Sequence, residues 1–451
     1  MKLMFCLTAG TLAAASVAGA QVGSGGTGRG DMPQRITYDD AVAIALRQNV
    51  SVKQAENATQ LSGATVSQQQ KAFLPSLSLN VTGSNNVGRN FSQSEGTIIN
   101  QQSQALSTGL SSSLTLFDGG KNISNLRSAR ADQEASEQDL TRTRQSAVFT
   151  VASNFVSLTN ANEQLKVQQE NLAALQSQEQ QIEAFVKAGS RPIADLYQQQ
   201  ALVANAQLAV AQAQRTVDLA KVDLIQTLQL DPAGRYDFVA SAATDDAMNR
   251  TYDLDTLVTL AYANRADLAA QSARVEAAGQ DVKAAAASKL PTISLTGSYS
   301  TAYSSATDLS IANQLDQRRG GGLGVGVSIP IFDRGSASAA EQKAQIAESN
   351  AQLALSQQRQ AIALDVRRAY LDFSSAKEQL KAATAQLAAA QKAVEATQAR
   401  YKVGAATLVE VSQAQAQEVS AASALATARN NLVLQEKAID FAVGGTTIGR
   451  K

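Results

Sequence analysis

The sequence predicts a mainly α-helical protein with a small β part, built from two internal repeats. Residues 121–188 form a 68-residue run without Gly or Pro, and residues 336–403 form a second run of the same length, again without either. Each is followed by a shorter uninterrupted run of 39 residues, 193–231 and 405–443. The two sets coincide at an offset of 215 residues, which indicates a duplicated structural unit.

The N-terminus is typical of a secretory signal peptide. Lys2 supplies the positive charge, Leu3–Ala15 supply an apolar stretch, and Ala18-Gly19-Ala20 form a small-residue cleavage site. The apolar stretch is well below the ~20 residues that span a bilayer as a helix. We therefore expect residues 1–20 to be removed and the mature protein to be exported.

Composition argues against catalysis. The only cysteine, Cys6, lies in the predicted signal peptide, and the chain has no His and no Trp. The mature protein thus lacks the thiolate and imidazole groups of zinc sites and nucleophilic enzymes. Lys plus Arg and Asp plus Glu number 39 each, so no basic surface for nucleic acid is expected. We expect no enzyme, no cofactor and no metal; a carboxylate-dependent secreted hydrolase is the alternative that composition leaves.

The long runs are predicted to be coiled-coil helices. Ala, Gln, Leu, Glu, Lys and Arg dominate them, and these residues favour helix. In the second run, large apolar residues recur every seven positions from Val366 through Phe373 to Tyr401, mostly with alanine three residues later. This heptad spacing predicts left-handed supercoiled packing, and each helix would extend roughly 100 Å.

Glycines mark the turns between the helices. Gly189 and Gly404 each follow a long run and precede a short one, as glycine does past a helix C-terminus. Long and short helices are therefore expected to form two antiparallel hairpins. Because each short helix covers only about half of its partner, the segments Thr37–Phe73 and Asp253–Lys289 are expected to cover the remainder.

Four strands are predicted where the helices stop, because the apolar period changes to two. They lie at residues 77–82, Gly109–Phe117, 293–300 and Leu323–Phe332. One apolar face, one small polar face and a length of ~9–11 residues are what a transmembrane barrel requires. The residues expected to face lipid are Leu77, Leu79, Val81, Leu114, Leu116, Ile293, Leu295, Tyr299, Val325, Val327 and Ile329.

The same alternation also describes half-buried strands of a soluble sheet. Two features favour the membrane: long polar loops, Gly83–Ser107 and Thr301–Gly322, separate the strands of each pair, and no second sheet is available to cover them. Four strands cannot close a barrel, since about eight is the minimum. We therefore predict a trimeric α-helical coiled-coil barrel continuous with a 12-stranded outer-membrane β-barrel, although strand closure alone would also permit a dimer.

Short motifs in this arrangement resemble the outer membrane efflux protein family, the TolC-like exit ducts. The motifs are Phe117-Asp118-Gly119-Gly120, Phe332-Asp333-Arg334-Gly335, Leu74-Pro75, Leu290-Pro291 and the tip glycines. The resemblance extends from Ile36 to Val443. It implies a homotrimeric channel in outer-membrane lipid, with a tunnel projecting into the periplasm, that passively conducts substrates in a tripartite efflux or type I secretion system.

The resemblance also implies partners. A periplasmic adaptor (membrane fusion) protein would dock on the helical tips, at Lys187, Gly189, Lys402 and Gly404, and an inner-membrane efflux pump or ABC transporter would supply the energy. A periplasmic coiled-coil adaptor or structural protein is the competing interpretation, because heptads alone would fit it.

In this family the periplasmic entrance is closed by links between the helical tips. By position, Asp195 corresponds to the acid of such a link and Tyr401 to the tip tyrosine. The arginine expected two residues after the second glycine is Ala406 here, so Arg191 of the other hairpin is the expected substitute.

An acidic ring at the entrance is implied in the same way. Glu410 corresponds to one ring position, and the next, three residues further on, is Gln413. Converging like charges would select cations. The alternative is that Asp195 and Glu410 are ordinary solvated helix charges.

The expected division of the chain follows. It comprises a signal peptide (1–20), a flexible N-terminal segment (21–35), a first repeat of helix, strand pair and hairpin (36–231), an equatorial linker (232–250), a second repeat (251–443) and a C-terminal tail (444–451).

Overall fold

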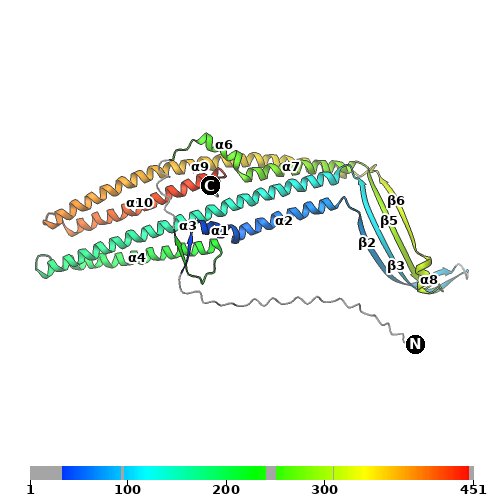
Figure 1. The fold of residues 1–451 in the computed structure, drawn as a ribbon, viewed down its shortest axis with the longest axis horizontal. Helices are drawn as coiled ribbons and strands as arrows, with labels where there is room; N and C mark the ends of the chain where they lie inside the picture. Colours follow the sequence, from blue (N-terminus) through cyan, green and yellow to red (C-terminus); the bar gives the residue numbers. More distant parts are fainter. Residues whose placement is uncertain (1–32, 93–95, 240–249, 308, 446–451) are drawn as a thin grey trace, which may run out of the picture.

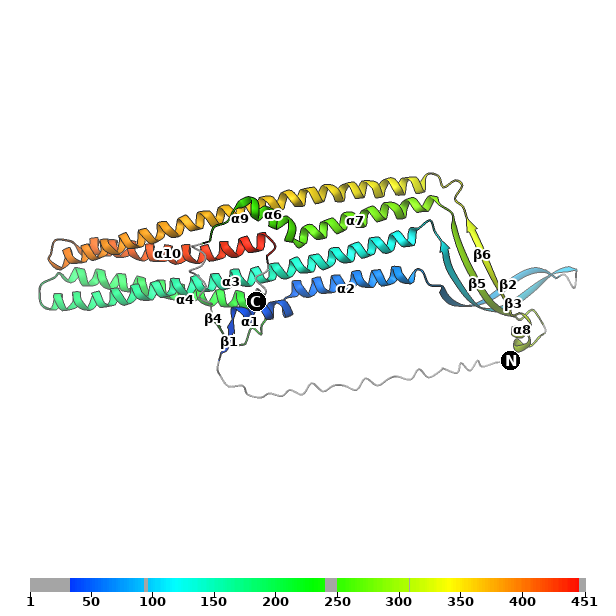
Figure 2. The ribbon, with the colours of Figure 1, turned by 45° about the horizontal axis from the view of Figure 1, so that its top comes forward.

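The computed structural model describes residues 33–92, 96–239, 250–307 and 309–445. The predicted signal peptide and most of the predicted N-terminal segment and C-terminal tail lie outside these residues. Figures 1 and 2 show an elongated molecule, with helical tips at one end and a sheet at the other. Among the helices described, none has the length and apolar character needed to cross a membrane.

The four hairpin helices confirm the prediction. The long helices have 67 residues each, and the short helices run back along them from the tips. They are α3 (Lys121–Lys187), α4 (Ile193–Leu228), α9 (Ser336–Lys402) and α10 (Leu408–Ala442). The predicted ends were one to three residues too long, because the turns themselves occupy those positions.

The heptad residues form the cores of the two hairpins, as predicted. Val151, Leu158, Val217 and Leu224 are buried together in the first repeat. Their counterparts in the second repeat are Val366, Phe373, Leu432 and Ile439. These apolar contacts hold each long helix to its own short helix, at about 25 cal/mol per Å² of buried apolar area.

The predicted covering segments are each split in two, which corrects the single helices expected there. Their parts are α1 (Tyr38–Gln48), α2 (Val50–Lys71), α6 (Leu254–Asn264) and α7 (Ala266–Ala286), followed by the short 3₁₀ helix η1 (Ala287–Lys289). The breaks fall at Asn49 and Arg265, where the backbone is extended. The Asn49 side chain accepts hydrogen bonds from the first turn of α2 and donates one to the carbonyl of Thr227 in α4, so a polar side chain ties the break in place.

The sheet is antiparallel in the order β2-β3-β5-β6. Its strands are β2 (Ser76–Ser92), β3 (Thr97–Phe117), β5 (Thr292–Ser304) and β6 (Gly320–Ser328). The predicted loop at residues 83–107 is wrong: β2 and β3 stay paired from Ser76 opposite Ser113 to Ser92 opposite Thr97. A helix, α8 (Ile311–Gln317), lies in the second loop.

The last strand also differs from its prediction. β6 begins at Gly320 and ends at Ser328, two residues before Pro330. Because proline has no N–H to donate, it does not continue a hydrogen-bonded ladder. Ile329 therefore lies one residue beyond the strand.

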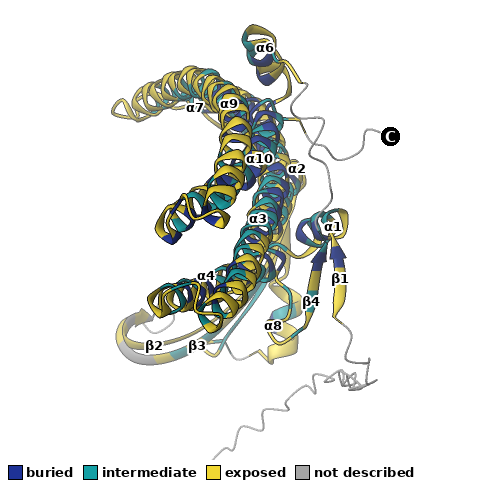
Figure 3. Cartoon of the chain, turned by 90° about the vertical axis from the view of Figure 1, so that its left-hand side faces the viewer, coloured by how far each residue is buried: buried dark blue, intermediate teal, exposed yellow. Residues whose placement is uncertain are grey.

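A second, two-stranded sheet lies at the equator. β1 (Gln34–Thr37) pairs in parallel with β4 (Tyr236–Val239), on the same side of the helical wall as α1 and α6 in Figure 3. β4 lies within the predicted linker, and β1 spans the predicted boundary between the flexible segment (21–35) and the first repeat. Ile36 and Phe238 are buried in the core of the first repeat, so both segments belong structurally to that repeat.

The helices form one curved wall, which Figure 3 shows end-on. Toward the tips the neighbours follow the order α4, α3, α10, α9, and toward the sheet the order α2, α3, α7, α9. α9 is therefore one open edge of the wall, and α4 with α2 form the other.

Candidate functional site: helical tips, equator and sheet face

The two helical tips have the same turn. Gly189 and Gly404 adopt left-handed φ angles of +70° and +77°, where a side chain would be strained. The N–H of Ser190 donates a 2.9 Å hydrogen bond to the carbonyl of Phe185, and the second turn has the equivalent bond at 2.8 Å. Each tip is thus a rigid glycine-capped turn, as predicted.

Arg191 and Tyr401 link the two tips. A guanidinium N–H of Arg191 donates a 3.1 Å hydrogen bond to the carbonyl of Tyr401, and the guanidinium carbon lies 4.3 Å from the ring centroid. Tyr401 is 8% exposed and packs with Ile182, Ala406, Leu408 and Val411. Ala406 is buried in this cluster, so the sequence places an apolar contact where the family motif has its arginine.

The phenol of Tyr401 is buried without a hydrogen-bond partner among the described residues. Burial raises its pKa; the Arg191 charge opposes that effect and the Asp195 charge adds to it. The carboxylate of Asp195 makes no hydrogen bond or ion pair within the part of the chain described. The structure therefore brings Arg191 and Tyr401 together, while Asp195 acts on Tyr401 only through its charge.

Glu410 stabilises the start of α10. Its carboxylate accepts hydrogen bonds from the N–H (3.3 Å) and hydroxyl (3.1 Å) of Thr407, whose hydroxyl in turn accepts from the N–H of Glu410 (3.3 Å). This capping box was visible as Thr-x-x-Glu but was not recognised in the sequence. Arg400 lies 3.7 Å from the same carboxylate, whereas Gln413 is exposed and its side chain makes no hydrogen bond among the described residues.

The outermost tip residues point to solvent. Lys187 is exposed and forms an ion pair with Glu183 (2.6 Å) in its own helix. Lys402 is also exposed, and Val403 beside it is 79% exposed. These are accessible positions, as docking would require.

The strand register places most of the predicted lipid-facing residues on one face. Ile293 lies opposite Val327, and Leu295 opposite Val325 and Leu114. Leu77, Leu79, Val81, Val325 and Val327 are at least 60% exposed. The opposite face is polar, as where the hydroxyls of Ser78 and Ser111 lie 2.7 Å apart.

Two predicted positions differ. Leu116 lies at a bulge between Thr115 and Phe117, and it is Phe117 that pairs with Ile293 on the apolar face. The extra residue of a bulge has no opposite partner, so strict alternation fails there. The second is Ile329, which lies beyond β6.

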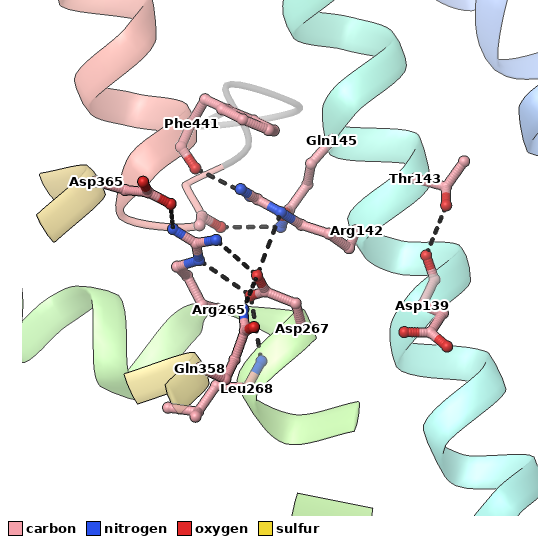
Figure 4. A network of polar contacts seen from close by, with 11 residues as sticks. Asp139, Arg142, Thr143, Gln145, Arg265, Asp267, Leu268, Gln358, Asp365 and Phe441 are labelled. Atoms are coloured by element: carbon pink, nitrogen blue, oxygen red, sulfur yellow. Dashed lines mark hydrogen bonds and ion pairs between the residues drawn. The ribbon is translucent and has the colours of Figure 1, made fainter. Parts of the chain in front are cut away.

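A network of charged side chains at the equator was not anticipated from the sequence. Figure 4 shows Arg142 of α3, Arg265 and Asp267 at the start of α7, and Asp365 of α9 converging beside Phe441 of α10. Arg265 donates two hydrogen bonds to Asp267 (2.6 and 3.0 Å) and lies 3.5 Å from Asp365. Arg142 donates to the carbonyl of Phe441 (3.0 Å) and lies 4.0 Å from Asp267.

The environment shifts two pKa values in this network. Burial, together with the neighbouring Arg265 charge, lowers the pKa of Arg142 to about 10. Burial alone would raise the pKa of Asp267, but hydrogen bonds from Arg265 and the charges of both arginines bring it below its ordinary value. Asp267 therefore holds two cations of different helices together.

Within the described residues, no cluster of three or more His, Cys, Asp or Glu side chains could hold a metal ion. The arrangement combines a long coiled-coil wall, two capped tips and a sheet with one exposed apolar face. It defines a TolC-like channel protein of the outer membrane, with its helices as the periplasmic tunnel.

Comparisons with known proteins agree with this class. The model of the family described as "Outer membrane efflux protein" matches this chain twice, over residues 41–228 and 257–445. The chain therefore belongs to the outer membrane efflux protein family, a family of efflux ducts. It is 27% identical over 329 residues to the outer membrane efflux protein BepC of Brucella suis; the match covers 72% of this chain and 66% of that relative.

Solved structures share the fold. The structure of CusC superposes with a TM-score of 0.79 at 22% identity, over 91% of this chain and 92% of the other. The outer membrane protein VceC of Vibrio cholerae superposes with a TM-score of 0.75 at 17% identity, over 90% and 96% of the two chains.

Proposed function

We propose that three copies of this chain close into one conduit that passively exports substrates from the periplasm through the outer membrane. The observation that carries the proposal is that wall and sheet are both open in the single chain. β2 and β6 are unpaired sheet edges, and α9 and α4 with α2 are free helical edges. A head-to-tail ring closes both layers with the same operation.

The sheet sets a minimum number of chains, and the width of the lumen favours three. Four strands per chain need at least a dimer, since about eight strands are the minimum for a barrel. Twelve strands enclose a lumen wide enough to conduct solutes, because barrel diameter grows with strand number. The competing interpretation, a periplasmic adaptor or structural coiled coil, gives the exposed apolar sheet face no role.

Partners follow from the channel proposal. A passive duct needs an energised inner-membrane pump or ABC transporter, and an adaptor that reaches the exposed tips at Lys187 and Lys402. The glycine-capped turns at Gly189 and Gly404 would present the same surface twice per chain, so three copies would offer six similar docking positions.

We further propose that the tips form the gated entrance. The Arg191–Tyr401 contact would fix the two hairpins of one chain to each other, in place of the family's arginine at position 406. Asp195 and Glu410 would supply negative charge near the entrance. Replacing Glu410 with Gln tests this charge cleanly, because glutamine also completes a capping box with Thr407.

The experiment is membrane fractionation followed by conductance recording in planar bilayers. We expect the protein in the outer-membrane fraction, with channel conductance and a preference for cations that Glu410→Gln weakens. Gln413→Glu is the matched control, since it adds charge one turn further on and should strengthen the preference. Recovery only in the soluble periplasmic fraction would overturn the channel, whereas unchanged ion preference in both variants would overturn only the role of Glu410.

A further inference from the structure

The contact between the two repeats inside one chain is polar and has a fixed register. α3 of the first repeat and α10 of the second run antiparallel. Three hydrogen bonds define their register: Asn430 to the carboxylate of Glu163 (2.7 Å), Gln164 to the carbonyl of Ser423 (2.8 Å) and Gln415 to the carbonyl oxygen of the Gln178 side chain (2.9 Å). We call this contact the internal seam.

The duplication implies a second copy of this seam between chains. The offset of 215 residues maps α3 onto α9 and α4 onto α10, as the paired core residues Val217 and Leu432 illustrate. α9 and α4 are the two open edges of the wall. When three chains form the proposed ring, α9 of one subunit meets α4 of the next, and the repeat predicts the register of that contact.

At the position between subunits that corresponds to the Asn430–Glu163 hydrogen bond of the internal seam, the repeat places two oppositely charged residues. Glu163 maps onto Glu378, and Asn430 maps onto Arg215. Both mapped side chains are exposed on their open edges, and neither takes part in an ion pair within the described residues. We propose that Glu378 of one subunit pairs with Arg215 of the next and sets the register of the assembled tunnel; the proposal rests on the ring proposed above.

Exposed apolar residues support this register independently. Mapped onto the seam, Leu371 (57% exposed) meets Leu219 (47%), and Leu364 (44%) meets Val222 (55%). These large apolar side chains are exposed in the single chain, and they lie on the two edges that the mapping brings together. Their burial in the ring would remove apolar surface from water and so stabilise the seam between subunits.

A cavity at the equator fits the same arrangement. The helix breaks at Asn49 and Arg265 align at an offset of 216, so Ser51, at the start of α2, is the counterpart of Asp267. Ser51 lines an open cavity of about 860 Å³. In the second repeat, the space beside Asp267 is filled by Arg142 of α3. The counterpart of Arg142 is Gln357 of α9, so α9 of the next subunit is the occupant that the repeat predicts for this cavity.

The first experiment is crosslinking with cysteine pairs. If the predicted signal peptide is removed with Cys6, introduced cysteines are the only thiols of the mature chain. With a short crosslinker that carries a thiol-reactive maleimide at each end, we expect Glu378→Cys with Arg215→Cys to yield covalent dimers and trimers. The matched control, Glu163→Cys with Asn430→Cys, should crosslink only within one chain.

The second experiment reverses the charges. We expect Glu378→Arg and Arg215→Glu each to lower the temperature at which the detergent-solubilised trimer dissociates, and the double variant to recover most of the loss, as a double-mutant cycle for a direct pair requires. A trimer that conducts but shows no interchain crosslink and no recovery would overturn the pair while leaving the channel in place. A protein that forms no trimer at all would overturn the ring on which the pair depends.

Discussion

The guanidinium of Arg191, in the first helical hairpin, lies over the ring of Tyr401, in the second, and donates to its backbone carbonyl. The two residues belong to different repeats, so this contact joins hairpins whose own helices are held by apolar cores. A cation over an aromatic face contributes about 0.5–2 kcal/mol, and a charged hydrogen bond about 1.5–3 kcal/mol.

Replacing Arg191 with Ala should therefore free the tips from each other. We expect the coupling between hairpins to weaken by about 2 kcal/mol, because the side chain is partly exposed. Single-channel recording should show a more open entrance, with larger or more frequent openings. Arg400→Ala is the matched control, since its hydrogen bond to Ala405 and its ion pair with Glu410 both lie within the second hairpin, so it should change the ion preference without freeing the tips. Equal effects of the two substitutions would contradict the link.

Tyr401 makes the tip sensitive to alkaline pH. Its folded pKa lies above the ordinary value near 10, because burial disfavours the ionised phenol, so ionisation favours the unfolded tip. The stability of the tip is therefore constant near pH 7 and falls as pH rises from the unfolded pKa through the folded pKa. Tyr401→Phe should leave the tip unchanged near pH 7, because the buried hydroxyl has no hydrogen-bond partner among the described residues. The same substitution should also abolish the loss of tip stability at alkaline pH. Hydrogen exchange of the tip amides between pH 7 and pH 11 measures both effects. If the Tyr401→Phe variant loses tip stability at alkaline pH as the native protein does, another group titrates there.

The helices were predictable because their signals are local. The helix α9 continues for 67 residues because no Gly or Pro interrupts it, and its heptad residues, Val366 to Tyr401, recur along one face. The outer ends of β2 and β3 were not predictable, since residues 83–107 are mostly polar and show no sustained alternation of apolar residues, which is typical of a loop. Pairing with the neighbouring strand, which no local pattern reports, makes them strands.

The site was predictable only in part. The resemblance placed Tyr401 and suggested Arg191, but the orientation of their contact depends on how two separate hairpins pack. The equatorial network joins Arg142 to Asp267, 125 residues apart, and no local motif marks either. Long-range ion pairs of this kind depend on tertiary packing, which composition and periodicity do not encode.

Asp267 should be the most sensitive residue of the equator. Asp267→Asn removes the charge between Arg142 and Arg265, and we expect a loss of about 2 kcal/mol, since breaking a fully buried pair costs about 3–5 kcal/mol and this side chain is partly exposed. Because the folded pKa of Asp267 is lowered, its contribution is present above the unfolded pKa near 4 and lost as pH falls through the folded value. In thermal unfolding measured from pH 7 down to pH 2, the stability of the variant should fall less than that of the native protein. Asp316→Asn, in an exposed pair with Arg319, is the control and should change little.

The turn from β3 into α3 contains a glycine at which a side chain is disfavoured both by the backbone conformation and by crowding. Gly119 has φ +70°, and a Cβ there would lie 2.9 Å from the Leu290 side chain. We expect Gly119→Ala to cost about 2–4 kcal/mol, from the left-handed backbone and the overpacking together. Gly120→Ala is the matched control: its φ is +87°, but nothing lies within 4 Å of the added Cβ, so only about 1–2 kcal/mol is expected. Thermal unfolding of the two variants measures the difference in stability. Equal destabilisation of both would show that the Leu290 side chain moves aside to accommodate the added Cβ.

The sheet face can be tested with two neighbouring residues of β5. Leu295 lies on the apolar face, opposite Val325, and Thr296 points to the opposite face, where its hydroxyl donates to the carbonyl of Gly324. Arginine facing lipid near the middle of the bilayer costs about 2–4 kcal/mol, whereas arginine facing the lumen stays hydrated. We expect Leu295→Arg to lower the amount of trimer inserted in outer membranes severalfold, and Thr296→Arg to insert normally but change the conductance. Both amounts can be compared by membrane extraction and immunoblotting. Normal insertion of Leu295→Arg with failure of Thr296→Arg would show that the two faces are reversed.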